Sequence, residues 1–147
     1  MVMRYFLMSL FLAAVDLGSK ETVKKYIPAG KKKQLGNKLY LWHIKNKGLA
    51  YNKFDDRRKV VLASSSAATC AVALYLIHLL KAGAKPLDKI GAALILGGGM
   101  GNLAERIKKG EVTDFIYIKA GKLPIFNIAD MFAAAGGMIV VIRSLFR

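Results

Sequence analysis

The apolar residues of this chain gather in four blocks, and the charged residues gather in the stretches between them. The second block, residues 60–80, runs for 21 residues without a formal charge. A block of this length can cross the hydrocarbon core of a bilayer, whereas a soluble helix would alternate polar and apolar faces. The pattern predicts one integral membrane domain over residues 1–147, with spans at approximately 1–17, 60–80, 89–104 and 125–146.

The first block has a competing interpretation, because Arg4 followed by an apolar run also fits a signal peptide. We interpret it as a span, since the three later blocks need a helix to pack against. The single cysteine, Cys70, excludes an intrachain disulfide, and no metal-ligand spacing occurs. His43 and His78 are isolated and are interpreted as interfacial side chains. We therefore expect neither a metal nor a cofactor.

The basic residues are divided unequally between the two ends of the four blocks. The loops at 18–59 and 105–125 carry 13 and five Lys or Arg residues, against six at the other end. The positive-inside rule would place these loops in the cytoplasm, although it weakens for long loops. Because the charge is split among loops and not set on one folded face, nucleic-acid binding is not expected.

Residues 39–44 are rich in aromatic side chains and contain no Gly or Pro, which predicts a strand. We expect it to pair with a neighbour near the turn at residues 46–48. Tyr40, Trp42 and Tyr51 would suit the bilayer interface, and they would suit the core of a small soluble hairpin equally well. In the second block, Ser64 to Ser66 and Thr69 are expected to bond carbonyls of their own helix.

The third block carries a glycine run, including a Gly97-x-x-x-Gly101 spacing. A face without side chains lets a second helix approach closely, and we expect that helix to be the fourth. A phosphate-binding loop is the alternative, but no Lys-Ser/Thr pair follows the glycines.

Asp16, Asp114 and Asp130 fall at the loop ends of the predicted spans. Ionisable groups at membrane depth are functional candidates. Two close carboxyls share a proton, so that one can act as base on a water while the other donates to a carbonyl oxygen. That chemistry is peptide hydrolysis without a covalent intermediate. The competing interpretation is that Asp114 and Asp130 only cap helix starts.

Five short motifs then occur in an order that resembles lipoprotein signal peptidase (signal peptidase II). They are Asp16-x-x-x-Lys20, Asn46-x-Gly48-Leu49-Ala50-Tyr51, Gly101-Asn102-x-x-x-Arg106, Val112-x-Asp114-Phe115 and Phe126-Asn127-x-Ala129-Asp130. Each motif is weak alone, but the five together extend over nearly the whole chain.

The resemblance implies an all-α membrane protein with four transmembrane helices and a small extracytoplasmic β region between the first and second spans. It implies a multi-pass enzyme of the cell membrane, with the active site at the extracytoplasmic face, against the loop charges. The implied activity is that of an aspartic endopeptidase cleaving signal peptides from diacylglyceryl-modified prolipoproteins just before the lipidated cysteine. The catalytic pair would be Asp114 and Asp130. The supporting or substrate-binding positions would be Asp16, Lys20, Asn46, Gly48, Asn102, Arg106 and Asn127.

The expected partners are lipidated prolipoprotein signal peptides and membrane lipids, anionic lipids among them, and the expected state is a monomer. Departures from the family pattern are Glu105, Leu49, Tyr51 and Met131, which leave the substrate proteins open. A non-catalytic basic four-helix membrane protein, binding anionic lipid or a partner helix, is the alternative function. A small transporter is a second rival, but it would need charges in mid-span.

Overall fold

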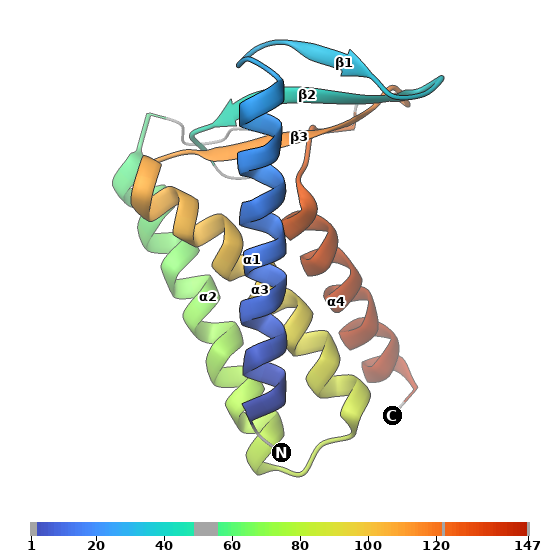
Figure 1. Ribbon diagram of the computed structural model, residues 1–147. Coiled ribbons are helices and arrows are strands. Elements are labelled where there is room, and N and C mark those ends of the chain that lie inside the picture. The colour runs from blue at the N-terminus through green and yellow to red at the C-terminus, as the bar shows by residue number, and fades with distance from the viewer. Residues whose placement is uncertain (1–2, 49–55, 122, 147) are drawn as a thin grey trace.

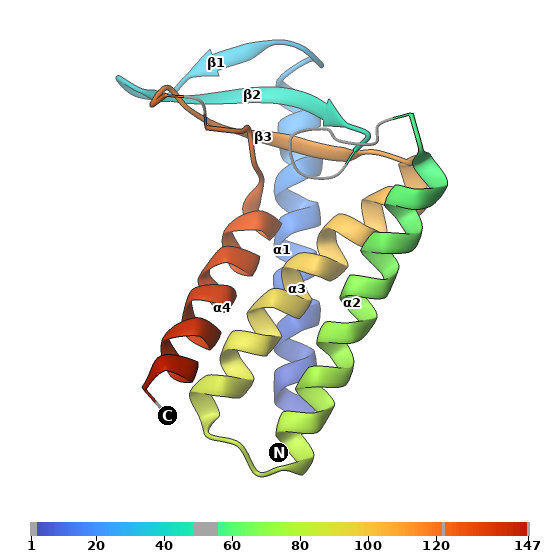
Figure 2. The same cartoon turned by 180° about the vertical axis from the view of Figure 1, so that it is seen from behind.

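The computed structural model describes residues 3–48, 56–121 and 123–146, and this part of the chain forms four helices and a three-stranded sheet. The elements are α1 (Met3–Tyr26), β1 (Lys32–Gln34), β2 (Leu39–Asn46), α2 (Arg58–Lys81), α3 (Pro86–Lys109), β3 (Val112–Ile118) and α4 (Ile128–Leu145). The helices run side by side, the sheet lies across one end of them, and both chain ends lie at the other end (Figures 1 and 2).

Local sequence signals fix the ends of the third and fourth helices. Pro86 occupies the first turn of α3, where its missing N–H costs nothing. Gly110 ends α3 in the left-handed conformation, with a φ of 75°, and its N–H bonds the carbonyl of Arg106. Asn127 begins α4 through a capping box with Asp130.

Glycines let α3 occupy the centre of the bundle, where it packs against each of the other three helices. A Cβ on Gly98 would lie 2.3 Å from the carbonyl oxygen of Ala129 in α4, so the fourth helix approaches closely, as the glycine run predicts. The Gly97-x-x-x-Gly101 spacing, however, faces α1: a Cβ on Gly97 would lie 2.8 Å from Leu12. The glycine run therefore receives α4 at Gly98, as predicted, and also receives α1 at Gly97 and Gly101.

The sheet has the antiparallel order β1-β2-β3. The predicted strand at 39–44 is present and extends to Asn46, but its partners precede it and follow α3. The turn that joins β1 to β2 lies near Gly36, where Leu35 and Gly36 donate to the carbonyl of Leu39. The predicted neighbour across the turn at residues 46–48 lies outside the described residues, and within them the β region also takes a strand from between α3 and α4.

Two helices run past the predicted span ends. α1 continues to Tyr26 because Val23 and Ile27 are buried against Phe115 of β3. α3 continues to Lys109 and its buried Glu105 faces β3. Residues 105–118 are therefore mainly the last turn of α3 and a strand, and the polar connection that the charges suggested is confined to the residues after Ile118. Asp114 accordingly lies in a strand and not at the end of a span.

The aromatic side chains of the sheet pack together. The ring of Tyr117 lies 5.9 Å from that of Tyr40 and 5.3 Å from that of Trp42, and the ammonium of Lys32 lies over the Tyr40 and Trp42 rings. His43 is buried, with its Nδ1 bonded to the carbonyl of Ile27, so its interpretation as an interfacial side chain is wrong. Tyr51, Leu49 and Ala50 lie outside the described residues.

Two helices, α2 and α4, are long and apolar enough to cross a membrane, and only 11% of the apolar window of each is buried in the protein. Outward-facing apolar side chains such as Leu74 and Met138 are exposed, at 67% and 64%. Such surfaces suit contact with lipid. α1 also exposes Phe11, at 67%, while its other face packs on α3.

Candidate active site

Asp114 and Asp130 come from a strand of the sheet and from the helix that follows it. Asp114 is buried in β3, and Asp130 lies in the first turn of α4. The chain between them folds back on itself, because Ile116 and Phe126 exchange backbone hydrogen bonds of 2.7 and 3.1 Å. Gly121, with a φ of 68°, lies within this return.

Two asparagine amides link the two carboxyl groups. Asn127 Nδ2 donates to Asp114 Oδ1 at 2.7 Å and to Asn102 Oδ1 at 3.1 Å. Asn102 Nδ2 then donates to Asp130 Oδ1 at 2.9 Å. Within the described residues no hydrogen bond joins the carboxyls directly. The sequence predicts a directly shared proton, whereas the structure connects the pair through neutral amides.

Besides its link to Asp114, Asp130 makes two further hydrogen bonds, both with Asn127. Its Oδ2 accepts the backbone N–H of Asn127 at 3.1 Å, and its own N–H donates to Asn127 Oδ1 at 3.0 Å. Asp130 thus takes part in capping α4, whereas Asp114 lies in a strand and caps no helix. The N-terminus of α4 and the donated hydrogen bonds both stabilise a negative charge on Asp130.

Asp16 and Lys20 support this arrangement from α1. The Asp16 carboxylate accepts the N–H of Ala129, at the start of α4, at 2.9 Å and pairs with Lys20 Nζ at 2.6 Å. Lys20 Nζ also donates to Asn102 Oδ1 at 2.7 Å. That bond fixes the amide so that its NH2 group faces Asp130. Both charged residues are fully buried, so each needs the other.

The opposite carboxyl, Asp114, is held by the sheet. Asn46 Nδ2 donates to Asp114 Oδ2 at 2.9 Å, and the Asn46 side-chain oxygen accepts the N–H of Gly48 at 3.0 Å. Arg106 Nη2 donates to the carbonyl of Gly48 at 3.0 Å. All nine residues singled out in the sequence therefore lie in one connected network.

Glu105 and Thr113 belong to the same region, although the sequence marked Glu105 only as a departure from a pattern. The Glu105 carboxylate accepts the N–H of Thr113 at 2.8 Å and its hydroxyl at 2.9 Å, and pairs with Lys24. These bonds fasten β3 to α3 one residue before Asp114. The only available signal was the charge of Glu105, which lies near the end of α3 and shortly before β3.

Burial raises the pKa of the Asp114 carboxyl to about 6. Burial is the largest cause of this net value; the charge of Asp130 also acts to raise the pKa, while the hydrogen bonds from Asn46 and Asn127 and the charge of Lys20 act to lower it. A carboxyl with this pKa keeps its proton well above the usual range for Asp. Asp114 can therefore still carry its proton at a pH at which an ordinary Asp has lost it.

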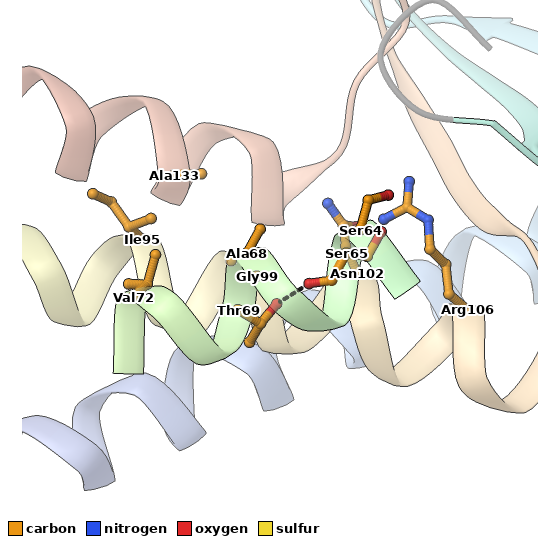
Figure 3. A pocket seen from close by; sticks show the side chains of 11 residues that line it. Ser64, Ser65, Ala68, Thr69, Val72, Ile95, Gly99, Asn102, Arg106 and Ala133 are labelled. Atoms are coloured by element: carbon orange, nitrogen blue, oxygen red, sulfur yellow. Dashed lines mark hydrogen bonds between the residues drawn. The ribbon is translucent and has the colours of Figure 1, made fainter. Parts of the chain in front are cut away.

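A cavity of about 380 Å³ opens beside this network, between α2, α3 and α4 (Figure 3). Asn102 and Arg106 line one end, and Val72 and Ile95 lie deeper along the helices. Asn102 is the link, because it lines the cavity and donates to Asp130. The described residues hold no group of three or more His, Cys, Asp or Glu placed to bind a metal.

Comparisons with known proteins agree with one another. The family model described as signal peptidase (SPase) II matches residues 8–146. The chain is 32% identical over 138 residues to the lipoprotein signal peptidase of Caldicellulosiruptor bescii, covering 94% of this chain and 88% of that protein. It is 29% identical over 141 residues to that of Brevibacillus brevis, covering 95% and 93%.

Solved structures share the fold. A bacterial membrane enzyme solved at 2.3 Å superposes with a TM-score of 0.84 and 22% identity, covering 97% of this chain and 87% of that one. Another solved at 1.9 Å gives a TM-score of 0.79, also at 22% identity, covering 97% and 92%. The four helices and the sheet are therefore an established arrangement of elements.

Proposed function

The chain belongs to the signal peptidase II family, and from this premise we propose that it is a membrane aspartyl endopeptidase. It cleaves the signal peptide of diacylglyceryl-modified prolipoproteins just before the lipidated cysteine. The observation that carries the proposal is the linked pair Asp114 and Asp130, held by two amides beside a cavity. The alternative, a non-catalytic basic membrane protein, does not require two linked carboxyls beside a cavity.

The two carboxyls take different roles in the proposed reaction. Asp130, as a carboxylate at the start of α4, removes a proton from the attacking water. Asp114, which retains its proton, donates to the carbonyl oxygen of the scissile bond as the tetrahedral intermediate forms. Asn102 and Asn127 orient both groups without adding charge, and Arg106 and Gly48 are suited to holding the substrate backbone. The reaction needs neither a metal nor a covalent intermediate.

The pH dependence of kcat/KM should be bell-shaped. The acid form of Asp114 is present below its pKa of about 6 and is lost as the pH rises through that value, so the alkaline limb should lie near pH 6. The acid limb should arise where the base becomes protonated. Initial rates of peptide cleavage measured across the pH range check this, and a rate that keeps rising above pH 8 would contradict an acid role for Asp114.

The substrate class is tested by comparing two precursor peptides that differ only in the lipid on the cysteine. The purified protein, in detergent or in vesicles, should cut the diacylglyceryl-modified peptide at the bond immediately before the cysteine. It should leave the unmodified peptide largely intact. Mass spectrometry of the products reads both the rate and the position of the cut. Equal cleavage of the two peptides would remove lipid recognition from the proposal, and cleavage of neither would overturn it.

The proposed orientation has four spans, both termini in the cytoplasm, and the sheet and dyad at the extracytoplasmic face. All four helices carry outward-facing apolar residues, and the two ends of the chain lie together opposite the sheet (Figure 1). A reporter fused after Arg147 should therefore be active only in the cytoplasm. An extracytoplasmic signal would support the orientation that the loop charges favour.

The proposed lipid partner of the sheet is an anionic bilayer surface. Lys31, Lys32 and Lys33 are exposed beside the aromatic cluster of Tyr40, Trp42 and Tyr117. Basic residues near such a surface contribute about 1 kcal/mol each. Changing all three to Gln should raise KM in anionic vesicles and leave kinetics in neutral detergent unchanged. An equal loss in both media would contradict lipid attraction. Since one chain holds every site residue, a monomer is expected to be active.

A further inference from the structure

The α2 wall of the cavity carries hydroxyl side chains in two successive turns (Figure 3). Ser64, Ser65 and Thr69 line it with Ala68 among them, opposite Gly99 of α3. The remaining lining is mainly apolar, apart from Asn102 and Arg106 at one end. The proposed reaction assigns these three hydroxyls no task.

The hydroxyls of Ser64 and Thr69 donate hydrogen bonds within α2, whereas that of Ser65 does not. Ser64 Oγ donates to the carbonyls of Val60 and Val61 at 2.8 and 3.1 Å, and Thr69 Oγ1 donates to that of Ser65 at 2.8 Å, as the sequence predicts. A hydroxyl has one proton and two lone pairs, so both oxygens can still accept. The Ser65 hydroxyl makes no hydrogen bond to any described residue, so it can both donate and accept.

A helical signal peptide that is extended for cleavage needs hydrogen-bond donors and acceptors from the enzyme. A peptide bond inside a helix is shielded from attack, so the signal peptide must be extended near the cut. Extending it leaves backbone N–H and C=O groups without helical partners. Water that could satisfy them is scarce at membrane depth, so the enzyme has to supply donors and acceptors.

The cavity leads from the candidate dyad into the bundle. Asn102, bonded to Asp130, lies at one end, and Val72 and Ile95 lie at the other. Thr69 lies between these ends, and Ser64 and Ser65 lie at the end of Asn102 (Figure 3). Gly99 leaves room for them: a Cβ there would lie 3.2 Å from Thr69 Oγ1. An extended segment upstream of the cut would therefore run past the α2 hydroxyls.

We propose that Ser64, Ser65 and Thr69 are positioning residues that hydrogen-bond the extended backbone of the signal peptide just upstream of the cut. This inference rests on the proposed function and deepens it. These three hydroxyls do not discriminate between signal-peptide sequences, because every signal peptide offers the same backbone groups. They select for a substrate that can unwind at this depth.

The test replaces the hydroxyls while keeping shape. The double variant Ser65→Ala with Thr69→Val should lower kcat/KM by about 10-fold, chiefly through KM, because two net hydrogen bonds are lost. Thr69→Ser should keep the hydroxyl and the activity. Ser66→Ala is the matched control, since Ser66 neighbours these residues without lining the cavity. The melting temperature of each variant identifies any loss of folding.

A modified substrate separates hydrogen bonding from structural effects. Lipidated peptides with one backbone N–H at a time replaced by an ester oxygen, within about four residues upstream of the cut, remove single donors. One such ester should slow the wild type by several-fold and slow the double variant no further.

The possible outcomes are distinct. If the wild type cleaves and the double variant matches it, or if the ester slows both equally, the hydroxyls have no such role and the proposed function stands. If the double variant loses activity only because it unfolds, Thr69→Val alone must still show the ester coupling, and its absence overturns the inference. If the wild type cleaves no lipidated precursor, the proposed function fails and this inference falls with it.

Discussion

Asp114→Asn and Asp130→Asn are each expected to lower the rate of precursor cleavage by about 10³-fold or more, because each removes the acid or the base of the proposed reaction. Both oxygens of each carboxylate accept a hydrogen bond, and asparagine keeps one accepting oxygen, so each variant loses one bond and should still fold and insert. The measurement is the rate of product formation on a lipidated precursor, alongside the melting temperature in detergent. Asp56→Asn, at an exposed position before α2, is the control.

Near-normal turnover of either variant would contradict the aspartyl peptidase assignment. In that case Asp130 would be left with its role as the capping partner of Asn127. Loss of activity accompanied by unfolding would identify a structural role, since a variant that acts on chemistry alone keeps its stability.

Gly98→Ala is expected to have the second large effect, because the new methyl group would meet backbone and not a flexible side chain. Its Cβ would lie 2.3 Å from the Ala129 oxygen and 3.2 Å from the Ala133 nitrogen. The first turn of α4, which carries Asp130, would have to move away from α3. Overpacking of this kind costs about 1–3 kcal/mol, and a shift of about 1 Å at a reacting group can cost about 10²-fold in rate.

Gly137→Ala provides the matched control within α4. A Cβ on Gly137 would meet nothing within 4 Å, so this substitution should keep full activity and gain about 1 kcal/mol from helix propensity. Melting temperatures and cleavage rates of the two variants check both expectations. Equal behaviour of Gly98→Ala and Gly137→Ala would mean that the close contact between α3 and α4 does not position Asp130.

The sequence predicted the helices better than it predicted their connections. Apolar blocks and glycine spacing indicate four helices in close contact, because both depend on residue type along one segment. The same patterns do not reveal where α1 ends. Its last turns are polar in composition, yet Val23 and Ile27 are buried by Phe115, which lies about 90 residues further on.

The strand containing Asp114 shows a second limit. Val112–Ile118 pairs with β2, and a single sequence gives no signal for pairing over such a separation. Asn102 and Asn127 were expected beside the two aspartates as supporting residues, but the atoms that they join could not be predicted. The link depends on Lys20 fixing the Asn102 amide from another helix. Motif order placed these residues together, whereas only the fold determines which atoms meet.

The claim that Asp114 and Asp130 act as one unit is tested most directly by kcat/KM for the wild type, the two single Asn variants and the double variant on one lipidated precursor. Residues that act in the same step have strongly non-additive effects. We predict that the double variant is no slower than the slower single variant. If the two losses multiply, the carboxyls act independently, and the linked acid–base pair is not the catalytic unit of this protein.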